Sequence, residues 1–399
     1  MAGDDRHPPA ALPGLNPSAP VVRPTYRKLS AFYFFYFAYL GAFAPFFALY
    51  LDSVGMTALQ IGVLMALPQV TRIVAPHLWG WLADFSGRRI GIVRAAGAAG
   101  TLAYLGVFAG ESFLLLFAVL LAMMFFWSAA LPLVEATTMT HLGDDLARYG
   151  RIRVWGSVGF IAAVVGLGYL IDATSPRALL WAVAALMLTM LLLSFAIGEA
   201  RVEPHPSDDL PVWHIVRRPE VIAIVAASAL MAAAHGPYYT FYTLHLVGHG
   251  YSKSAAGWLW ALGVVCEIGI FVWMSRLYQA YSLRAILIAS TLLAALRFVI
   301  IGWATESFVL LLAAQTLHAA SFGSFHAAAI GMVHRLFRGR HQARGQAIYG
   351  SLAYGLGGSL GGLASGYAWG AFGAGPTFTL AGLCALLAAA VLWKGLREA

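Results

Sequence analysis

The chain has 399 residues, of which 60% are hydrophobic and only 11% are charged, and its mean hydropathy is +0.76. A soluble domain of this size could not bury so much apolar surface, so lipid must cover much of it. The net charge of +8 does not indicate nucleic-acid binding, because the basic residues are spread over short loops and form no patch or stripe. Cys266 and Cys384 both lie in apolar stretches and give neither a disulfide framework nor the ligand spacing of a metal site.

The N-terminal segment 1–28 is rich in Pro, Ala and charged residues and lacks the apolar core of a signal peptide. The first hydrophobic stretch follows Arg27 and Lys28 and is long enough to cross a membrane, which predicts an uncleaved anchor. We expect residues 1–28 to form a disordered cytoplasmic tail.

Twelve hydrophobic stretches of spanning length follow, each of about 20 residues or more. They lie near residues 30–51, 58–82, 92–110, 112–138, 152–171, 177–198, 219–247, 255–277, 283–303, 307–334, 346–371 and 376–394. The longest internal polar stretch, 199–218, separates the first six from the last six. The sequence therefore predicts an all-α membrane protein with an N-terminal six-helix bundle over 29–198, a cytoplasmic linker over 199–218 and a C-terminal six-helix bundle over 219–399.

The basic residues predict the orientation of these spans. Most of the 25 Lys and Arg residues lie at the chain ends or in the even-numbered loops between spans. Since cytoplasmic loops carry the excess of basic residues, both termini are predicted to be cytoplasmic.

Three ionisable side chains lie inside neighbouring apolar spans: Glu267 in the eighth, Arg297 in the ninth and His318 in the tenth. A charged group at mid-bilayer is costly unless it is paired or faces a wet cavity. These residues therefore predict a polar chamber inside the protein. In it, we expect Glu267 to carry a proton, which is released or captured when the distance between Glu267 and Arg297 changes. His318 is expected to relay this proton or to hold the carboxylate. The alternative is a structural ion pair, for which Glu267 and Arg297 supply the partners.

A motif in the loop after the second span points to a family. The segment Gly80-Trp-Leu-Ala-Asp84-Phe-Ser-Gly87-Arg88-Arg89 has a glycine that permits a tight turn, and Asp84 lies near a helix end facing the two arginines. An ordinary basic turn is the alternative, but type, spacing and position closely resemble the signature loop of the major facilitator superfamily. In that family the loop forms a charge relay that holds the cytoplasmic side in one conformation. The resemblance implies a gating role for Asp84, Gly87, Arg88 and Arg89.

The region from the fourth to the fifth span is similar to lactose permease and its relatives. Its motifs are Leu133-Val-Glu135-Ala and Tyr149-Gly-Arg-Ile-Arg153. There a carboxylate and an arginine bind sugar, so the resemblance implies that Glu135 and Arg153 bind substrate.

The last spans are similar to the same permease at Glu267, Arg297 and His318, which match residues of its proton-coupling network. Lactose permease has a further glutamate one helical turn after its histidine, whereas this chain has Ser321. The family's coupling scheme is therefore not carried over intact.

Other motifs more closely resemble the 3-phenylpropionate permease branch of the superfamily, near which a nucleoside–proton symporter subgroup lies. They are Tyr149-Gly-Arg-Ile-Arg-Val-Trp-Gly-Ser157, Ala234-His235-x-x-Tyr238-Tyr239, Leu317-His318 and an arginine, Arg72, inside the second span. The resemblance implies transport of an aromatic monocarboxylate, with His235 among the residues that bind it.

An aromatic monocarboxylate needs one cation for its carboxylate and aromatic walls for its ring. Arg72 or Arg153 can supply a bidentate donor. The candidates for the aromatic walls are Tyr33, Tyr36, Trp155, Tyr238 and Tyr239. For each of them, the alternative role is packing or contact with lipid. Conversely, a neighbouring Glu135 and Arg153 would suit the hydroxyls of a sugar or nucleoside, and the residues alone leave the substrate class open.

We therefore predict a proton-coupled symporter of a bacterial inner membrane that needs no cofactor. It is expected to act as a monomer, in which two helix bundles rock about a substrate site at the midplane of the membrane. The predicted partners are protons, a small molecule and lipid. A membrane-embedded enzyme is disfavoured because the chain has no Ser/His/Asp arrangement, His-Glu-x-x-His metal motif or nucleotide loop. A non-transporting sensor is disfavoured because no soluble domain is appended.

Overall fold

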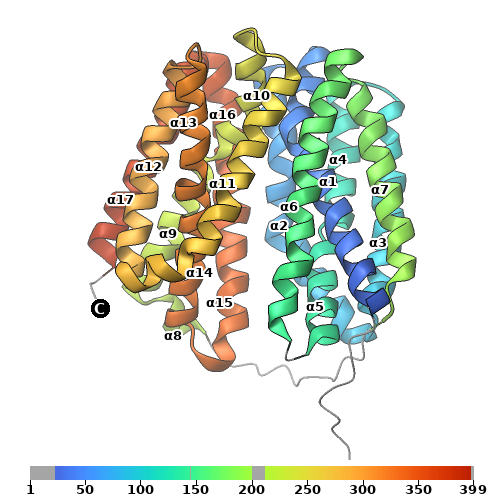
Figure 1. Ribbon diagram of the computed structural model, residues 1–399, viewed down its shortest axis with the longest axis vertical. Helices are drawn as coiled ribbons and strands as arrows, with labels where there is room; N and C mark the ends of the chain where they lie inside the picture. The colour runs from blue at the N-terminus through green and yellow to red at the C-terminus, as the bar shows by residue number, and fades with distance from the viewer. Residues whose placement is uncertain (1–22, 144, 200–211, 397–399) are drawn as a thin grey trace, which may run out of the picture.

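The computed structural model describes residues 23–143, 145–199 and 212–396, and nearly all of them form helices that run side by side along one long axis (Figure 1). The N-terminal half contains α1 (Arg23–Ser53), α2 (Ala58–Ser86), α3 (Arg89–Tyr104), the short η1 (Leu105–Phe108), α4 (Phe113–Trp127), α5 (Ala130–Leu142), α6 (Leu146–Ala173) and α7 (Ala178–Ala196). The C-terminal half contains α8 (Trp213–Val216), α9 (Pro219–Ala234), α10 (Gly236–Gly248), α11 (Lys253–Ala280), α12 (Leu283–Trp303), α13 (Phe308–His318), η2 (Ala319–Ser324), α14 (Phe325–Leu336), η3 (Gly339–His341), α15 (Gln342–Tyr349), η4 (Gly350–Gly357), α16 (Gly358–Phe372) and α17 (Ala374–Gly395). The predicted all-helical class is confirmed.

Eleven helical segments in the described part of the chain are long and apolar enough to cross a membrane. The twelfth predicted span is the helical run Gln342–Phe372, in which the π-helical η4 separates α15 from α16. A second π-helical segment, η2, interrupts the tenth span between α13 and α14. Because π-helical turns are rare and concentrate at functional sites, these two spans are the first places to search for one.

The described ends of the chain, Arg23 and Leu396, lie at the same end of the molecule, which we call the terminal end (Figure 1). Helix α1 begins inside the segment expected to be a tail, and the rest of that segment, 1–22, lies outside the described residues. Within the expected linker, α8 is helical and 200–211 are not described. The domain boundaries and the cytoplasmic location of the terminal end stay predictions.

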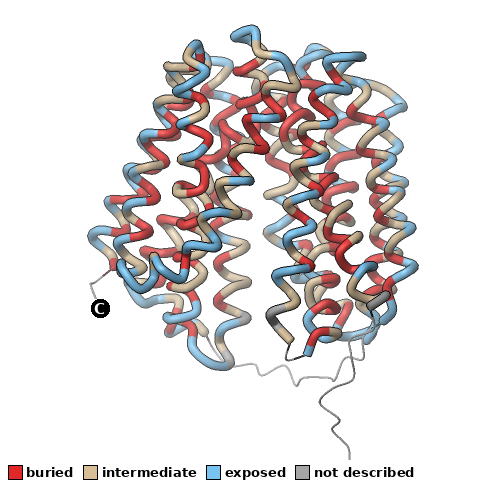
Figure 2. The backbone as a smooth tube through the Cα atoms, viewed as in Figure 1, coloured by how far each residue is buried: buried red, intermediate tan, exposed pale blue. Residues whose placement is uncertain are grey.

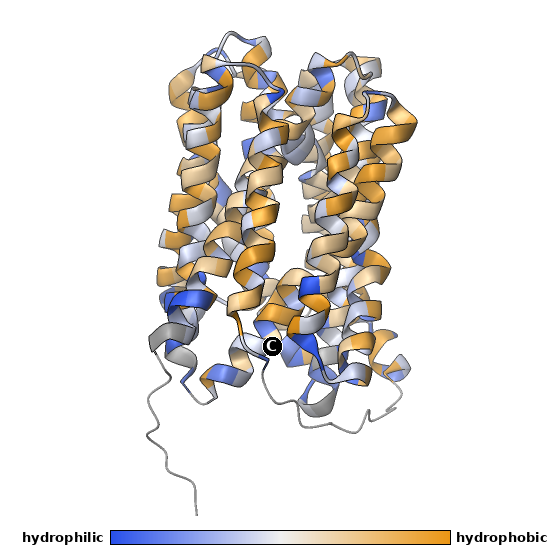
Figure 3. Ribbon diagram, turned by 90° about the vertical axis from the view of Figure 1, so that its right-hand side faces the viewer, coloured by the Kyte–Doolittle hydropathy of each residue, from blue (hydrophilic) through white to orange (hydrophobic). Residues whose placement is uncertain are grey.

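Apolar side chains cover the outside of the bundle as well as its interior. Buried residues lie between the helices, while exposed ones follow the outer surface (Figure 2). Leu114 and Val272 are each 74% exposed on that surface. Hydrophobic residues extend along the height of the helices, and hydrophilic ones gather near the terminal end (Figure 3). This pattern is the one that a lipid-covered bundle requires.

Glycines bring helices of the two halves into backbone contact. A Cβ atom on Gly62 of α2 would lie 2.7 Å from the Cα of Gly366 in α16, so neither helix could approach so closely with a larger residue. Within the C-terminal half, Gly361 of α16 faces the carbonyl oxygen of Ala233 in α9, which lies 2.4 Å from the position of an added Cβ. The glycines of the eleventh span therefore pack it between the second and seventh spans.

Candidate functional site

A break between α9 and α10 positions His235 inside the seventh span. Pro237, at the start of α10, has no N–H to donate to the preceding turn, so the hydrogen-bond ladder of α9 ends there. The Nδ1 atom of His235 lies 2.8 Å from the carbonyl oxygen of Met231. Since a carbonyl can only accept, Nδ1 carries the hydrogen of this bond. His235 is thus a buried imidazole held in one orientation at a helix junction.

The three predicted coupling residues come together in the C-terminal half around one aromatic ring. The Cζ atom of Arg297 lies 4.0 Å from the ring centroid of Tyr238, and the His318 ring centroid lies 5.5 Å from it. The Nε2 atom of His318 lies 4.0 Å from Oε2 of Glu267. We call Glu267, Arg297, His318, His235 and Tyr238 the C-terminal polar cluster.

The direct ion pair between Glu267 and Arg297, which the structural alternative requires, is absent from the described structure. The Nε atom of Arg297 donates to the carbonyl oxygen of Ala314 at 3.1 Å, and the guanidinium covers Tyr238. No nitrogen of Arg297 lies within 4.0 Å of a carboxylate oxygen of Glu267. Both terminal nitrogens, Nη1 and Nη2, are buried and lack a hydrogen-bond partner among the described residues.

A second cluster lies in the N-terminal half. The hydroxyl of Tyr149 donates to Oε1 of Glu135 at 3.1 Å, and the Cζ atom of Arg153 lies 4.0 Å from the ring centroid of Phe37. Glu135 and Arg153 therefore do not form the direct carboxylate–guanidinium pair that a hydroxyl-binding site was expected to use.

Between the halves lies a cavity of about 180 Å³. Its walls come from α2, α9, α10, η2, α14, η4 and α16: Met65, Gln69, Arg72, Ser228, Met231, Ala232, His235, Gly236, Tyr239, Thr240, Ser321, Phe322, Phe325, Tyr354, Gly358 and Gly362. Both π-helical segments contribute to it, η2 through Ser321 and Phe322 and η4 through Tyr354. The cavity joins the second span to the C-terminal half.

Arg72 supplies the positive charge of the cavity wall. Its Cζ atom lies 5.3 Å from the ring centroid of Tyr354, whose hydroxyl is 2.6 Å from Nδ1 of His326. No carboxylate oxygen of the described residues lies within 4.0 Å of Arg72. A cation without a carboxylate partner, beside an aromatic ring, is a suitable site for an anionic ligand.

The structure divides the predicted aromatic walls into two groups. Tyr239 lines the cavity, whereas Tyr238 lies behind it and donates to Oε1 of Gln315 at 3.0 Å. Tyr33 and Tyr36 are buried in the N-terminal half, where Tyr36 stacks on Trp127. Trp155 is 45% exposed and does not line the cavity. In this conformation only Tyr239 of the five can contact a ligand in the cavity.

Sequence reasoning missed several wall residues. Gln69 lines the cavity and is a neutral polar residue within an apolar span, which was a detectable signal. Phe322 and Tyr354 gave no signal, because an aromatic residue in an apolar or glycine-rich run is most simply interpreted as packing.

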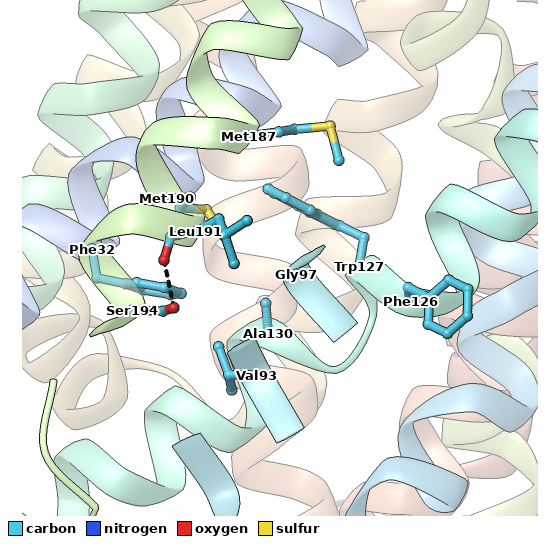
Figure 4. Close-up of a pocket in the computed structure, with 10 residues that line it drawn as sticks. All are labelled: Phe32, Val93, Gly97, Phe126, Trp127, Ala130, Met187, Met190, Leu191 and Ser194. Carbon is cyan, nitrogen blue, oxygen red and sulfur yellow. Dashed lines mark hydrogen bonds between the residues drawn. The ribbon is translucent and has the colours of Figure 1, made fainter. Parts of the chain in front are cut away.

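A second hollow, within the N-terminal half, is too small for a substrate (Figure 4). Its volume is about 10 Å³, and the room for one water molecule is also on the order of 10 Å³. Among its walls the hydroxyl of Ser194 already donates to the carbonyl oxygen of Leu191 at 2.6 Å. This hollow is a packing gap between α1, α3, α4, α5 and α7.

The loop motif forms the turn between α2 and α3. Gly87 ends α2 with φ of 66°, a left-handed conformation that favours glycine. Arg89 donates from Nη1 to the Thr140 hydroxyl at 3.2 Å, while Asp84 is exposed and within the described chain has no ion pair with Arg88 or Arg89. The turn is present as expected, but the charges of its own loop do not pair in this conformation.

Comparison with known proteins identifies the family. The sequence model of the MFS_1 like family matches residues 26–380. The chain belongs to this family. It is a multi-pass membrane transporter of the major facilitator superfamily that handles small molecules, and not an enzyme.

The known proteins that resemble this MFS transporter are named for different substrates. The chain is 31% identical to the "Probable 3-phenylpropionic acid transporter" of Escherichia coli (strain K12) over 341 residues, 84% of this chain and 88% of that protein. It is 25% identical to the maltose permease of Geobacillus stearothermophilus over 367 residues, 90% and 92% of the two chains. The crystal structure of nucleoside transporter NupG shares the fold, with a TM-score of 0.84 and 16% identity over 94% of this chain and 100% of that one.

Proposed function

We propose that this MFS transporter is a proton-coupled symporter for a small aromatic carboxylate such as a phenylpropionate. The observation that carries the proposal is the position of Arg72, a cation without a carboxylate partner in the described structure, in a cavity walled by Tyr239, Phe322 and Tyr354. The guanidinium would bind the carboxylate, and the aromatic rings would contact the ring of the substrate. The name of the phenylpropionic acid relative supports the same substrate class.

The size of the cavity supports a single-ring substrate. A dry cavity of about 150 Å³ holds one benzene ring, and the cavity between the halves is about 180 Å³. A ring with a short acid chain fits such a volume, whereas a disaccharide would require a larger opening of the two halves. The sugar or nucleoside alternative stays a second candidate, because sequence relatives named for maltose and for nucleoside transport match 90% and 76% of the chain.

We assign proton coupling to Glu267, His318 and Arg297. Ser321, which replaces the lactose permease glutamate, is buried and donates to the carbonyl oxygen of His318 at 3.3 Å, so it offers no carboxylate. Glu267 is thus the carboxylate of the C-terminal polar cluster, and its side chain is 20% exposed. Movement of Arg297 toward or away from Glu267 would release or admit that proton.

Rocking of the two halves would expose the cavity alternately on each side of a bacterial inner membrane. The loop residues Asp84, Gly87, Arg88 and Arg89 would control closure at the terminal end, where α2 turns into α3. We propose that one chain is sufficient for this cycle.

Uptake into proteoliposomes tests the proposal. Purified protein is reconstituted and offered labelled 3-phenylpropionate, maltose or a nucleoside, with and without an imposed proton gradient. We expect gradient-dependent accumulation of 3-phenylpropionate that a protonophore abolishes. Accumulation of maltose or the nucleoside alone would show that the proposed substrate class is wrong. Uptake that is the same with and without the proton gradient would contradict proton coupling. A sensor would accumulate none of the three.

A further inference from the structure

At the end of the molecule opposite the termini, the last turn of α6 contacts the first turn of α11 and joins the two halves (Figure 1). Oδ1 of Asp172 accepts a hydrogen bond from the backbone N–H of Lys253 at 2.9 Å, and Oδ2 accepts one from that of Ser254 at 2.8 Å. The ammonium of Lys253 lies 3.9 Å from Oδ1. One carboxylate of the N-terminal half therefore satisfies two N–H groups that helix geometry leaves free at the start of a helix in the other half.

Close backbone packing places Asp172 within reach of α11. A Cβ atom on Gly168 would lie 2.6 Å from the carbonyl oxygen of Lys253, and one on Gly257 would lie 2.5 Å from that of Val164. On the outer surface of the same contact, Nε1 of Trp258 donates to the hydroxyl of Tyr169 at 3.2 Å. The contact is thus a built interface of complementary groups, not an incidental approach of two helices.

The α6–α11 contact has no counterpart toward the terminal end. There the ribbons of α6 and α11 separate (Figure 1), and within the described residues no hydrogen bond or ion pair joins 146–163 to the C-terminal half. Among the described residues, the other hydrogen bonds between the halves lie on α2, where Nε2 of His77 is 2.8 Å from the Ser351 hydroxyl and that hydroxyl also contacts the carbonyl oxygen of Ile73. The α6 and α11 helices are therefore held together at one end only.

We propose that Asp172 is a gating residue: its carboxylate, bound to the N-terminus of α11, holds the end opposite the termini closed and must release before that end can open. The inference rests on the proposed alternating access, and it adds a gating contact to the loop motif at the other end of the molecule. Asp172 does not line the cavity, so it acts on the equilibrium between conformations and not on the substrate itself. A contact made in only one of two conformations shifts their populations by its full strength.

The Asp172→Asn substitution tests the contact with little change in shape. The amide keeps one accepting oxygen but presents an NH₂ group to the other N–H, and it removes the negative charge that favours a helix N-terminus. We expect the population open at this end to rise by roughly tenfold, the effect of losing one charge-assisted hydrogen bond.

Distances between spin labels report that population without any substrate. Labels are placed on Ser175→Cys and Glu306→Cys, two exposed positions at this end in different halves, in protein whose native cysteines are replaced by alanine. Double electron–electron resonance in lipid nanodiscs should show a larger long-distance population in Asp172→Asn. The matched control is Asp52→Asn, an exposed carboxylate at the same end without an ion pair among the described residues. An unchanged distribution in Asp172→Asn, or an equal change in the control, overturns the proposal.

A second variant, Gly257→Ala, tests the same contact if Asp172→Asn does not fold. Its Cβ would push against the Val164 carbonyl, so the long-distance population should rise again. In proteoliposomes the half-saturating substrate concentration offered from that side should fall in proportion, because more transporters present an open site. Unchanged distances with normal uptake would overturn the gating role alone, whereas a wild-type protein that transports nothing would overturn the proposed function.

Discussion

In the N-terminal half, Glu135 accepts a hydrogen bond from Tyr149 and Arg153 covers the ring of Phe37, whereas in the C-terminal half both terminal nitrogens of the fully buried Arg297 lack a partner in the described structure. An unpaired polar group in a buried site costs about 1–3 kcal/mol. None of the side-chain nitrogens and oxygens of Glu135, Tyr149 and Arg153 is buried without a partner, so the C-terminal cluster is the one that gains free energy by finding a new partner. This difference indicates that the C-terminal half changes its contacts during the proposed cycle.

The largest expected effect is the loss of coupling in Glu267→Gln. An amide cannot carry a proton, so we expect gradient-driven accumulation to fall to the level of protein-free liposomes, while exchange of substrate across the membrane continues. Accumulation and exchange are measured in the same proteoliposomes.

The control for this variant is Glu135→Gln, the buried glutamate of the N-terminal half. It should keep gradient-driven accumulation, because its carboxylate already has a hydrogen-bond partner in Tyr149. Equal losses in both variants would remove the distinction between the two halves.

The next effect in size is on substrate affinity in Arg72→Ala. Removal of charge-assisted hydrogen bonds should weaken carboxylate binding roughly tenfold to a hundredfold. The corresponding neutral amide should bind no worse than before, since it makes no use of the charge. Isothermal titration of the purified variant with both ligands measures the two affinities. Arg151→Ala, at an exposed position outside the cavity, is the matched control. Parallel losses for acid and amide would argue against the carboxylate role.

Sequence alone predicted the helical architecture, because runs of about 20 apolar residues identify spans. It also singled out Arg72, which lines the cavity, and Glu267 and His318, which lie near each other, since a charge inside such a run is costly without a reason. Their roles stay predictions. It could not decide whether Glu267 pairs directly with Arg297, because span assignment does not fix how helices are rotated about their axes. The same limit hid the contribution of Tyr354, which η4 turns into the cavity.

A smaller effect is expected on thermal stability when a buried arginine of either half is replaced by methionine. Arg297→Met removes a buried cation that has no carboxylate partner among the described residues and makes one hydrogen bond, to the Ala314 carbonyl oxygen. Met is an apolar chain of similar length, so the unfolding temperature should change by no more than about 3 °C. Coupling should nevertheless be lost. Differential scanning fluorimetry and gradient-driven uptake measure the two outcomes.

Arg94→Met provides the comparison for this variant in the N-terminal half. Arg94 donates to the carbonyl oxygens of Ser194 at 3.3 Å and Ile197 at 2.9 Å, so its loss leaves two acceptors without their donor. Its unfolding temperature should fall by more than that of Arg297→Met. The reverse order would show that Arg297 serves mainly to stabilise the fold.

The smallest effect is expected for Tyr149→Phe, which removes the hydrogen bond to Glu135 at the N-terminal cluster. This cluster does not line the cavity, so the loss should cost about 1 kcal/mol of stability and leave the affinity for an aromatic carboxylate within about twofold. Tyr238→Phe is the matched variant in the C-terminal half, where the lost bond to Gln315 lies beside Arg297 and should reduce coupling. Titration with 3-phenylpropionate and maltose distinguishes the two substrate classes. A strong loss of maltose binding in Tyr149→Phe would place the substrate on Glu135 and Arg153, as a sugar site requires.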